Sequence, residues 1–91
     1  MIFEWDEKKA VSNLKKHGVS FIEAATVFLD PLSITVVDSE HSVEEYRFLD
    51  VGLSDKGRLL VVSYAERSFH IRIISSRPAL PVERKAYEKG N

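Results

Sequence analysis

Asp30-Pro31 divides the chain into two regions that differ in the spacing of their apolar residues. Before this pair, apolar residues recur every three to four positions, which predicts amphipathic helices over 8–16 and 21–29. After it, apolar residues alternate with polar ones or form a continuous run, and we expect four strands at 32–38, 46–53, 59–65 and 70–75. A region of helices followed by a region of strands is typical of an α+β domain with a mainly antiparallel sheet.

The two ends of the chain complete this order of elements. A short alternating run around Glu4 predicts an opening strand. Pro81 near a first helical position and Gly90 beyond the helix end predict a closing helix over 82–89. The predicted order is β-α-α-β-β-β-β-α in a single domain over residues 1–91, with the helices on one face of the sheet and the other face open.

Length and composition exclude several classes of protein. The chain has 91 residues, 44% of them hydrophobic and 30% charged, which suits one core and leaves no room for a second domain. It has no cysteine, so a disulfide scaffold, a thiolate nucleophile and any metal site that needs cysteine are excluded. The first residues form no export leader, and no uncharged run is long enough to span a membrane, so we expect a cytoplasmic protein.

Charge is distributed unevenly along the chain. The net charge of −1 disfavours nucleic-acid binding, because phosphate neutralisation supplies most non-specific affinity. Residues 1–45 carry four lysines and nine acidic groups, a balance of −5, whereas residues 46–91 carry nine basic and five acidic groups, a balance of +4. All six arginines lie in the second region. Solvated faces produce similar differences, but guanidinium groups also bind phosphate through two parallel hydrogen bonds.

The motifs of several enzyme classes are missing. No Gly-x-Ser-x-Gly sequence marks a serine hydrolase, and the four glycines are scattered rather than grouped in a phosphate-binding loop. His41 lies among the acidic residues Asp38, Glu40 and Glu45, but such clusters in loops are more often solvated charge than a metal site. We therefore expect neither a metal nor a cofactor.

Acid–base chemistry supported by arginine remains. Metal-free cleavage of RNA needs a base for the ribose 2′-hydroxyl, cations for the charge that builds on the phosphate, and an acid for the leaving 5′-oxygen. The candidate acid–base groups are His41, Glu45, Glu66 and His70. The candidate phosphate ligands are Arg47, Arg58, Arg67, Arg72 and Arg77, with Tyr64 or Tyr87 to stack on a base or donate a hydrogen bond.

An ordinary structural role stays open for some of these residues. Arg58 follows a turn glycine, for example, and can simply be solvated. Residues two apart in one strand share a face, but the sequence does not give the register between strands. If Arg47, Tyr64 and Arg72 look out on the same side, they form a cationic patch with an aromatic platform.

Several short motifs follow one another along nearly the whole chain. They are Phe3-Glu-Trp-Asp6, Lys15-Lys-His-Gly-Val-Ser-Phe21, Glu23-Ala24, Val27-Phe28, His41-Ser42, Arg47, Gly57-Arg-Leu59, Tyr64, Arg67, Arg72-Ile-Ile-Ser-Ser-Arg77, Glu83-Arg84 and Tyr87. In this order they resemble the BrnT toxins. The stretch from Ser76 to Pro81 departs from that pattern, because the family leads us to expect Ala at 76 and more polar or basic residues after it.

The resemblance implies a RelE-like fold and a type II toxin–antitoxin role. Such a toxin is a metal-independent endoribonuclease that inhibits translation, and a BrnA-like antitoxin, which carries the DNA-binding part, neutralises it in a hetero-oligomer. The toxin then contacts RNA directly and DNA only through the antitoxin. By position, the implied functional residues are Arg47, Arg58, Tyr64, Arg67, Arg72 and Arg77, with His41 and Glu45 as acid–base candidates.

Two other functions fit the same residues. The first is a toxin-like module that has lost strong cleavage and tunes the DNA binding of its antitoxin. The second is a small α+β domain whose sheet serves only as a protein interface, so that its arginines matter only to stability. The effects of Arg72→Ala and Arg77→Ala on growth inhibition and on antitoxin binding distinguish these functions.

Overall fold

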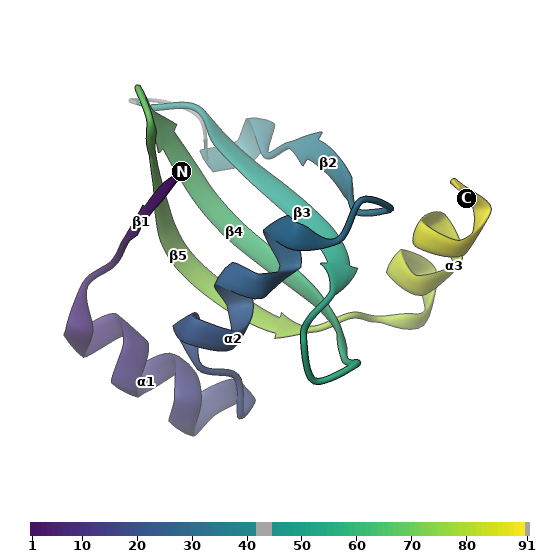
Figure 1. The fold of residues 1–91 in the computed structure, drawn as a ribbon, viewed down its shortest axis with the longest axis horizontal. Coiled ribbons are helices and arrows are strands. Elements are labelled where there is room, and N and C mark those ends of the chain that lie inside the picture. Colours follow the sequence, from purple (N-terminus) through teal and green to yellow (C-terminus); the bar gives the residue numbers. More distant parts are fainter. Residues whose placement is uncertain (42–44, 91) are drawn as a thin grey trace.

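A five-stranded sheet forms the centre of the molecule, with strand order β1-β5-β4-β3-β2 (Figure 1). The computed structural model describes residues 1–41 and 45–90. β1 pairs with β5 in parallel, and the other neighbouring strands are antiparallel. The elements in chain order are β1 (Ile2–Glu4), α1 (Glu7–His17), α2 (Phe21–Thr26), the 3-10 helix η1 (Val27–Leu29), β2 (Ile34–Val37), the 3-10 helix η2 (Ser39–His41), β3 (Arg47–Leu53), β4 (Leu59–Arg67), β5 (His70–Pro78) and α3 (Pro81–Lys89).

Local sequence signals explain where the first two helices begin and end. The carboxylate of Asp6 accepts hydrogen bonds from the backbone N–H groups of Lys8 and Lys9, and Gly18 ends α1 in the left-handed conformation with a φ of 69°. The hydroxyl of Ser20 then accepts a hydrogen bond from the backbone N–H of Glu23 and starts α2. The helix predicted over 21–29 is present as α2 and the 3-10 turn η1.

The larger core lies between one face of the sheet and the helices α1 and α2. Its buried side chains come from the loop before α2, from α2 and η1, and from the strands β4 and β5, and they include Val19, Phe21, Val27, Leu60, Val62 and Ile73. Asn13 fastens α1 to the sheet, because its side-chain amide exchanges two hydrogen bonds, of 2.9 and 3.0 Å, with the backbone of Ser76. We call this covered side the inner face.

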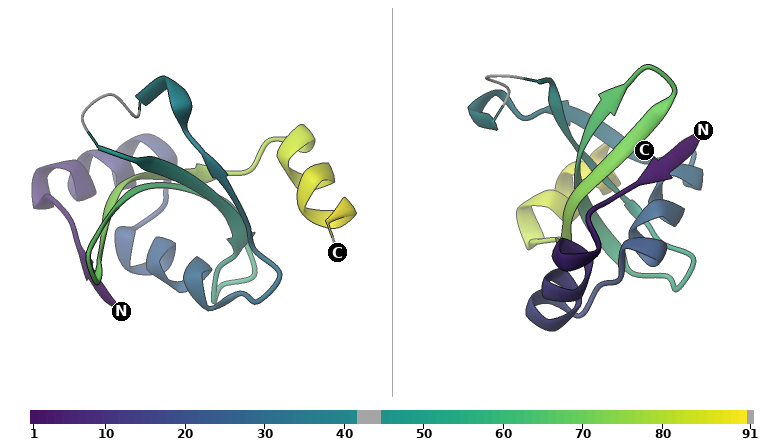
Figure 2. Two further views of the ribbon diagram at one scale, coloured as in Figure 1. Left: turned by 90° about the horizontal axis from the view of Figure 1, so that it is seen from above. Right: turned by 90° about the vertical axis from the view of Figure 1, so that its left-hand side faces the viewer.

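The third helix packs on the opposite side, which we call the outer face. There Tyr87 of α3 covers Val51, Leu59 and Val61 in a second, smaller core. In the left view of Figure 2, α2 lies inside the curve of the sheet and α3 lies outside it. The prediction that the helices share one face is therefore wrong for α3. The physical reason is that β4 is apolar on both sides, so each face of this strand needs a cover.

The α+β class and the mainly antiparallel sheet are confirmed. The described residues form one five-stranded sheet and three α-helices. α3 packs on the part of the outer face around Val51, Leu59 and Val61, away from the start of β3, the end of β4 and the start of β5. None of the described helices is long and apolar enough to cross a membrane.

Candidate active site

Two arginines lie on the outer face, away from the part that α3 covers. In the register of the sheet, Ala65 of β4 stands between Arg47 of β3 and Arg72 of β5. Side chains of directly paired residues in a sheet point to the same side, so both guanidinium groups rise from the same face. Glu4 of β1 continues this row, because it pairs with Arg72. A small alanine side chain in the middle leaves room between the two cations.

A carboxylate at the start of β3 brings a third arginine to this row. Glu45 accepts hydrogen bonds from Arg72 and from Nη2 of Arg67, the second at 3.1 Å, and its Oε1 lies 3.8 Å from Nε of Arg47. The side chains of Glu45 and Arg72 are 23% and 27% exposed, so they are partly shielded from water, whereas Arg67 is 60% exposed. We call Glu45, Arg47, Arg67 and Arg72 the arginine site.

The charges in the arginine site do not cancel. Three guanidinium groups surround one carboxylate, and hydrogen bonds from Arg72 and then from Arg67 hold the pKa of Glu45 below its usual range. Glu45 is therefore ionised at neutral pH. The Nε atom of Arg72 is buried and has no hydrogen-bond partner among the described residues. A surplus of cations with unused donor capacity is suited to an anion such as a phosphodiester.

A histidine lies at the edge of the arginine site. His70 is the register partner of Arg67 across the β4–β5 turn, and its Nδ1 lies 3.6 Å from a carboxylate oxygen of Glu4. Glu4 is not among the candidates predicted from the sequence, although a carboxylate between the apolar residues Phe3 and Trp5 indicates a charge on one side of a strand. The other predicted histidine, His41, ends η2, and its side chain lies outside what the structure describes.

The structure separates Tyr64 from the arginine site. Tyr64 pairs with Phe48, so it points to the inner face, where its ring packs against Phe48 and Phe28 with centroid distances of 5.6 and 4.8 Å. It is only 5% exposed, and its hydroxyl donates a hydrogen bond to the buried carboxylate of Asp50. Burial and the charge of Asp50 raise the pKa of Tyr64. The prediction of an aromatic platform beside Arg47 and Arg72 is therefore wrong.

Arg58 also lies away from the arginine site. Its Nε donates to Oε2 of Glu23 at 2.9 Å, and its Nη2 donates to the other oxygen of Glu23 and to the backbone carbonyl of Gly18. Glu23 is almost fully buried, and the hydrogen bond from Arg58 is the largest cause that lowers its pKa. Arg58 thereby fastens the start of α2 to the turn between β3 and β4.

Arg77 lies on the same face as the arginine site, but its side chain binds a residue of α3. Its two terminal nitrogens donate to the two carboxylate oxygens of Glu83, both at 2.8 Å. Glu83 also accepts a hydrogen bond from the backbone N–H of Leu80 at the start of α3. Tyr87 is likewise engaged, because its hydroxyl donates to Asp30 at 2.7 Å. The family resemblance implies five arginines and Tyr64 as functional residues. Of these six, the structure brings together Arg47, Arg67 and Arg72.

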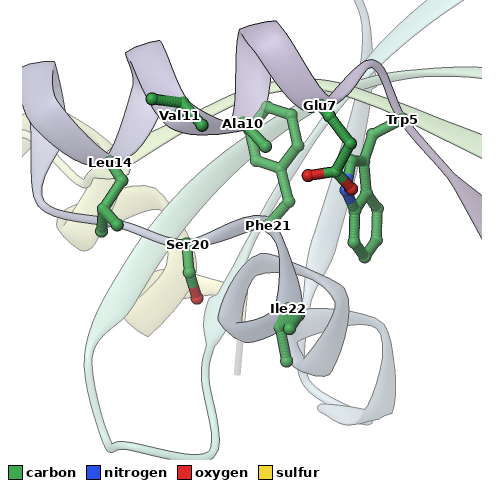
Figure 3. A pocket seen from close by; sticks show the side chains of 8 residues that line it. All are labelled: Trp5, Glu7, Ala10, Val11, Leu14, Ser20, Phe21 and Ile22. Atoms are coloured by element: carbon green, nitrogen blue, oxygen red, sulfur yellow. The ribbon is translucent and has the colours of Figure 1, made fainter.

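A separate groove runs between α1 and the start of α2 (Figure 3). It has a volume of about 220 Å³ and is lined mainly by apolar side chains, which belong to Trp5, Ala10, Val11, Leu14, Phe21 and Ile22, together with Glu7 and Ser20. Its one carboxylate, that of Glu7, accepts a hydrogen bond from the indole of Trp5 at 3.1 Å. The groove contains no arginine or histidine. Over residues 1–41 and 45–90, no group of three or more His, Cys, Asp or Glu side chains is placed to hold a metal ion.

Comparison with known proteins matches this chain to one protein family and to a solved structure. The sequence model of a family described as "Ribonuclease toxin, BrnT, of type II toxin-antitoxin system" matches residues 5–83. The crystal structure of the Brucella abortus ribonuclease toxin, BrnT, is similar with a TM-score of 0.65 and 23% sequence identity, and the match covers 88% of this chain and 99% of that one. At this identity the structural likeness concerns the fold alone. The comparison with curated protein sequences found no match.

Proposed function

Because the chain belongs to the BrnT family of ribonuclease toxins of type II toxin–antitoxin systems, we propose that its arginine site is the active site of a metal-independent endoribonuclease. Cleavage of RNA there inhibits translation, and a BrnA-like antitoxin neutralises the enzyme in a hetero-oligomer. The fold is of the RelE-like kind in this proposal, and the protein works in the cytoplasm. DNA is contacted only through the antitoxin.

One observation carries the proposal: guanidinium groups from three neighbouring strands converge on the single carboxylate of Glu45. Like a carboxylate, a phosphodiester has two anionic oxygens, its non-bridging ones, that accept hydrogen bonds from guanidinium groups. Arginines on the strands of a sheet hold a substrate phosphate in a fixed place, because the backbone beneath them is rigid. Their charge stabilises the additional negative charge that the phosphate gains in the transition state.

Glu45 is the base that we assign to this reaction. Its lowered pKa makes it a carboxylate at neutral pH, so it can accept the proton of the ribose 2′-hydroxyl but cannot donate one. When a phosphate draws Arg67 and Arg72 toward itself, the hydrogen bonds that lower the pKa of Glu45 weaken. The carboxylate then becomes a stronger base at the moment when the substrate is in place.

The acid for the leaving 5′-oxygen must be a different group. His70 is the register partner of Arg67, and its Nδ1 lies 3.6 Å from a carboxylate oxygen of Glu4, so an imidazole that can carry a proton stands beside the arginine site. His41, at the end of η2, is the other candidate. Replacing each histidine with glutamine and measuring cleavage of an RNA with a good leaving group at the 5′-oxygen identifies the acid, because such a substrate no longer needs it.

Induced expression in cells tests the proposed function. Wild-type protein is expected to stop growth and protein synthesis, and coexpression of the antitoxin is expected to relieve the arrest. Arg72→Gln should abolish the arrest and still bind the antitoxin. Arg84→Gln is the matched control, since Arg84 is an exposed arginine of α3 outside the arginine site and should behave like wild type. Arrest by Arg72→Gln at wild-type protein levels would refute the proposal.

A second function has an observation in its favour. Arg58 and Arg77, two of the five predicted phosphate ligands, are engaged in ion pairs that hold α2 and α3. Fewer cations are then left for RNA than the sequence predicts, which favours a weakly active toxin that tunes the DNA binding of its antitoxin. For this function, folded wild-type protein causes no arrest, and the antitoxin binds its DNA differently with and without this chain.

A further inference from the structure

A small basic pocket lies between α1 and the edge of β5. Its volume is about 180 Å³, and its lining consists of Lys9, Ser12, Asn13, Lys16, His17, Ile74 and Ser75. We call it the α1–β5 pocket. Two lysines, a histidine and two hydroxyl groups contribute to it, and no carboxylate does. This composition is suited to an anion that accepts hydrogen bonds.

The pocket has fixed walls. Asn13 is only 6% exposed, and its amide joins α1 to the backbone of Ser76 on β5 through two hydrogen bonds and to the backbone carbonyl of Val19 through a third. Lys9 and Lys16 are seven positions apart, which is close to two helical turns, so both side chains lie on the same flank of α1. The helix therefore presents both ammonium groups to this side of β5.

The positive charge of Lys9 does not stabilise α1. This lysine stands in the first turn of the helix, where the helix dipole disfavours a cation. Lys16 and His17 in the last turn suit the dipole, but neither they nor Lys9 form an ion pair with any residue that the structure describes. The pocket thus holds cations without a partner carboxylate, whereas the cations of the arginine site share Glu45.

One residue of the α1–β5 pocket, Ser75, lies on the same face of the sheet as the arginine site. Ser75 pairs with Ser63, and Arg72 pairs with Ala65 two residues further along β4, so both β5 residues belong to the outer face. The extra residue of a β-bulge near Ser63 and Tyr64 makes this possible. Arg72 and Ser75 are three positions apart on β5, or about 10 Å along the strand. This span is short enough for neighbouring phosphates of one RNA strand.

We propose that the α1–β5 pocket binds a backbone phosphate of single-stranded RNA, next to the phosphate that the arginine site holds. The inference rests on the proposed ribonuclease function and extends its substrate site from the sheet to α1. Lys9 and Lys16 supply the charge, and the hydroxyl groups of Ser12 and Ser75 donate hydrogen bonds. The N-terminal region therefore takes part in RNA binding, although its overall charge is negative.

Two double variants of the same helix test this proposal. Lys9→Gln with Lys16→Gln removes both ammonium groups of the pocket, and Lys8→Gln with Lys15→Gln removes the same charge from another flank of α1, outside the pocket lining. The probe is an octanucleotide with 2′-O-methyl groups, which cannot be cleaved. Its dissociation constant is measured at several salt concentrations for each purified variant, for wild type and for Arg72→Gln.

The pocket variant is expected to bind the octanucleotide at least tenfold more weakly than the control variant. The slope of log affinity against log salt should fall by about 0.7, because one phosphate contact is lost on a single strand. A dinucleotide with one phosphate should bind both double variants equally. These results would support a second phosphate site on α1.

The remaining outcomes overturn the inference in distinguishable ways. If Arg72→Gln weakens binding but the two double variants bind alike, the arginine site stands and the α1–β5 pocket is not a phosphate site. If wild type and Arg72→Gln both fail to bind the octanucleotide, the proposed function and the inference fail together. If the pocket variant loses the antitoxin while it keeps the RNA, the pocket belongs to a protein interface.

Discussion

Two arginines of this chain, Arg58 and Arg72, each hold a glutamate, and the burial of that glutamate decides what the arginine does. The partner of Arg58 is Glu23, whose side chain is 2% exposed, whereas the partner of Arg72 is Glu45, which is 23% exposed. A buried carboxylate that loses its cation destabilises the fold, because its charge is left without a partner. A partly exposed carboxylate can be hydrated by solvent instead. We therefore assign Arg58 to stability and Arg72 to the substrate.

Arg58→Gln is expected to destabilise the protein by about 3 kcal/mol, at the lower end of the cost of breaking a buried ion pair. The lower end applies because Arg58 itself is 40% exposed and Lys56 and Ser54 remain near Glu23. Arg72→Gln should change the free energy of unfolding by less than about 1 kcal/mol. Urea unfolding of both variants measures this difference. Equal destabilisation would contradict the division of roles.

Glu45→Gln keeps the size of the side chain and removes its charge. We expect cleavage of RNA to slow by about 100-fold or more, which is typical of a lost general base. Binding of an uncleavable RNA should stay the same or become tighter, because the phosphate no longer competes with a carboxylate for Arg67 and Arg72. Single-turnover cleavage and equilibrium binding separate these effects. A variant that cleaves as fast as wild type would show that Glu45 is not the base.

At the scale of single residues, the alternation of side chains along a strand is not enough to predict which face of the sheet each residue occupies. Arg72 and Ser75 have opposite parity along β5, yet the bulge near Ser63 and Tyr64 brings both to the outer face. Tyr64 points inward because it pairs with Phe48, and no residue of the sequence fixes this register. Residue type identifies the arginines as candidates, but only the register shows which of them meet at Glu45.

At the scale of elements, α3 shows how a predicted helix can be placed on the wrong side. Pro81 and Gly90 correctly bound it, and the structure has Pro81–Lys89. The sequence does not say which face it covers, since both faces of β4 are apolar. Arg77 and Tyr87 decide this through their hydrogen bonds to Glu83 and Asp30. The two side chains that looked like substrate ligands hold the helix on the outer face.

Arg77→Gln is expected to loosen α3 without unfolding the sheet. The loss of a partly exposed, doubly hydrogen-bonded ion pair should cost about 1–2 kcal/mol. Amide hydrogen exchange should accelerate over residues 81–89 and stay unchanged in β4 and β5. RNA cleavage should remain within about threefold of wild type, because the arginine site is intact. Loss of cleavage with a protected α3 would place Arg77 in the active site instead.

At the scale of the whole molecule, the two faces of the sheet have separate tasks. The inner face carries the main core with α1 and α2, and the outer face carries α3 over the second core and the arginine site away from it. The net charge of −1 conceals this arrangement, because acidic groups elsewhere on the chain offset the outer-face cations. Family membership implies an antitoxin partner, and we expect such a partner to block the arginine site.

Association with the antitoxin should therefore depend on salt. An acidic docking segment is steered toward the arginine site by long-range attraction, which salt screens. We expect the association rate constant to fall at least tenfold between low and high salt, while dissociation changes little. Stopped-flow measurements with wild type and Arg67→Gln give both rates. An association rate that is insensitive to salt would mean that the antitoxin neutralises the toxin by other contacts.

The central claim is that the arginine site cleaves RNA, and cleavage by the purified protein in the presence of a metal chelator tests it most directly. Wild type, Arg72→Gln and Arg84→Gln are compared on one RNA, after unfolding measurements have shown equal stability. The account predicts that wild type and Arg84→Gln cleave alike and that Arg72→Gln is about 100-fold slower or worse. Cleavage by Arg72→Gln at the wild-type rate, or none by folded wild type with or without added metal, would contradict it.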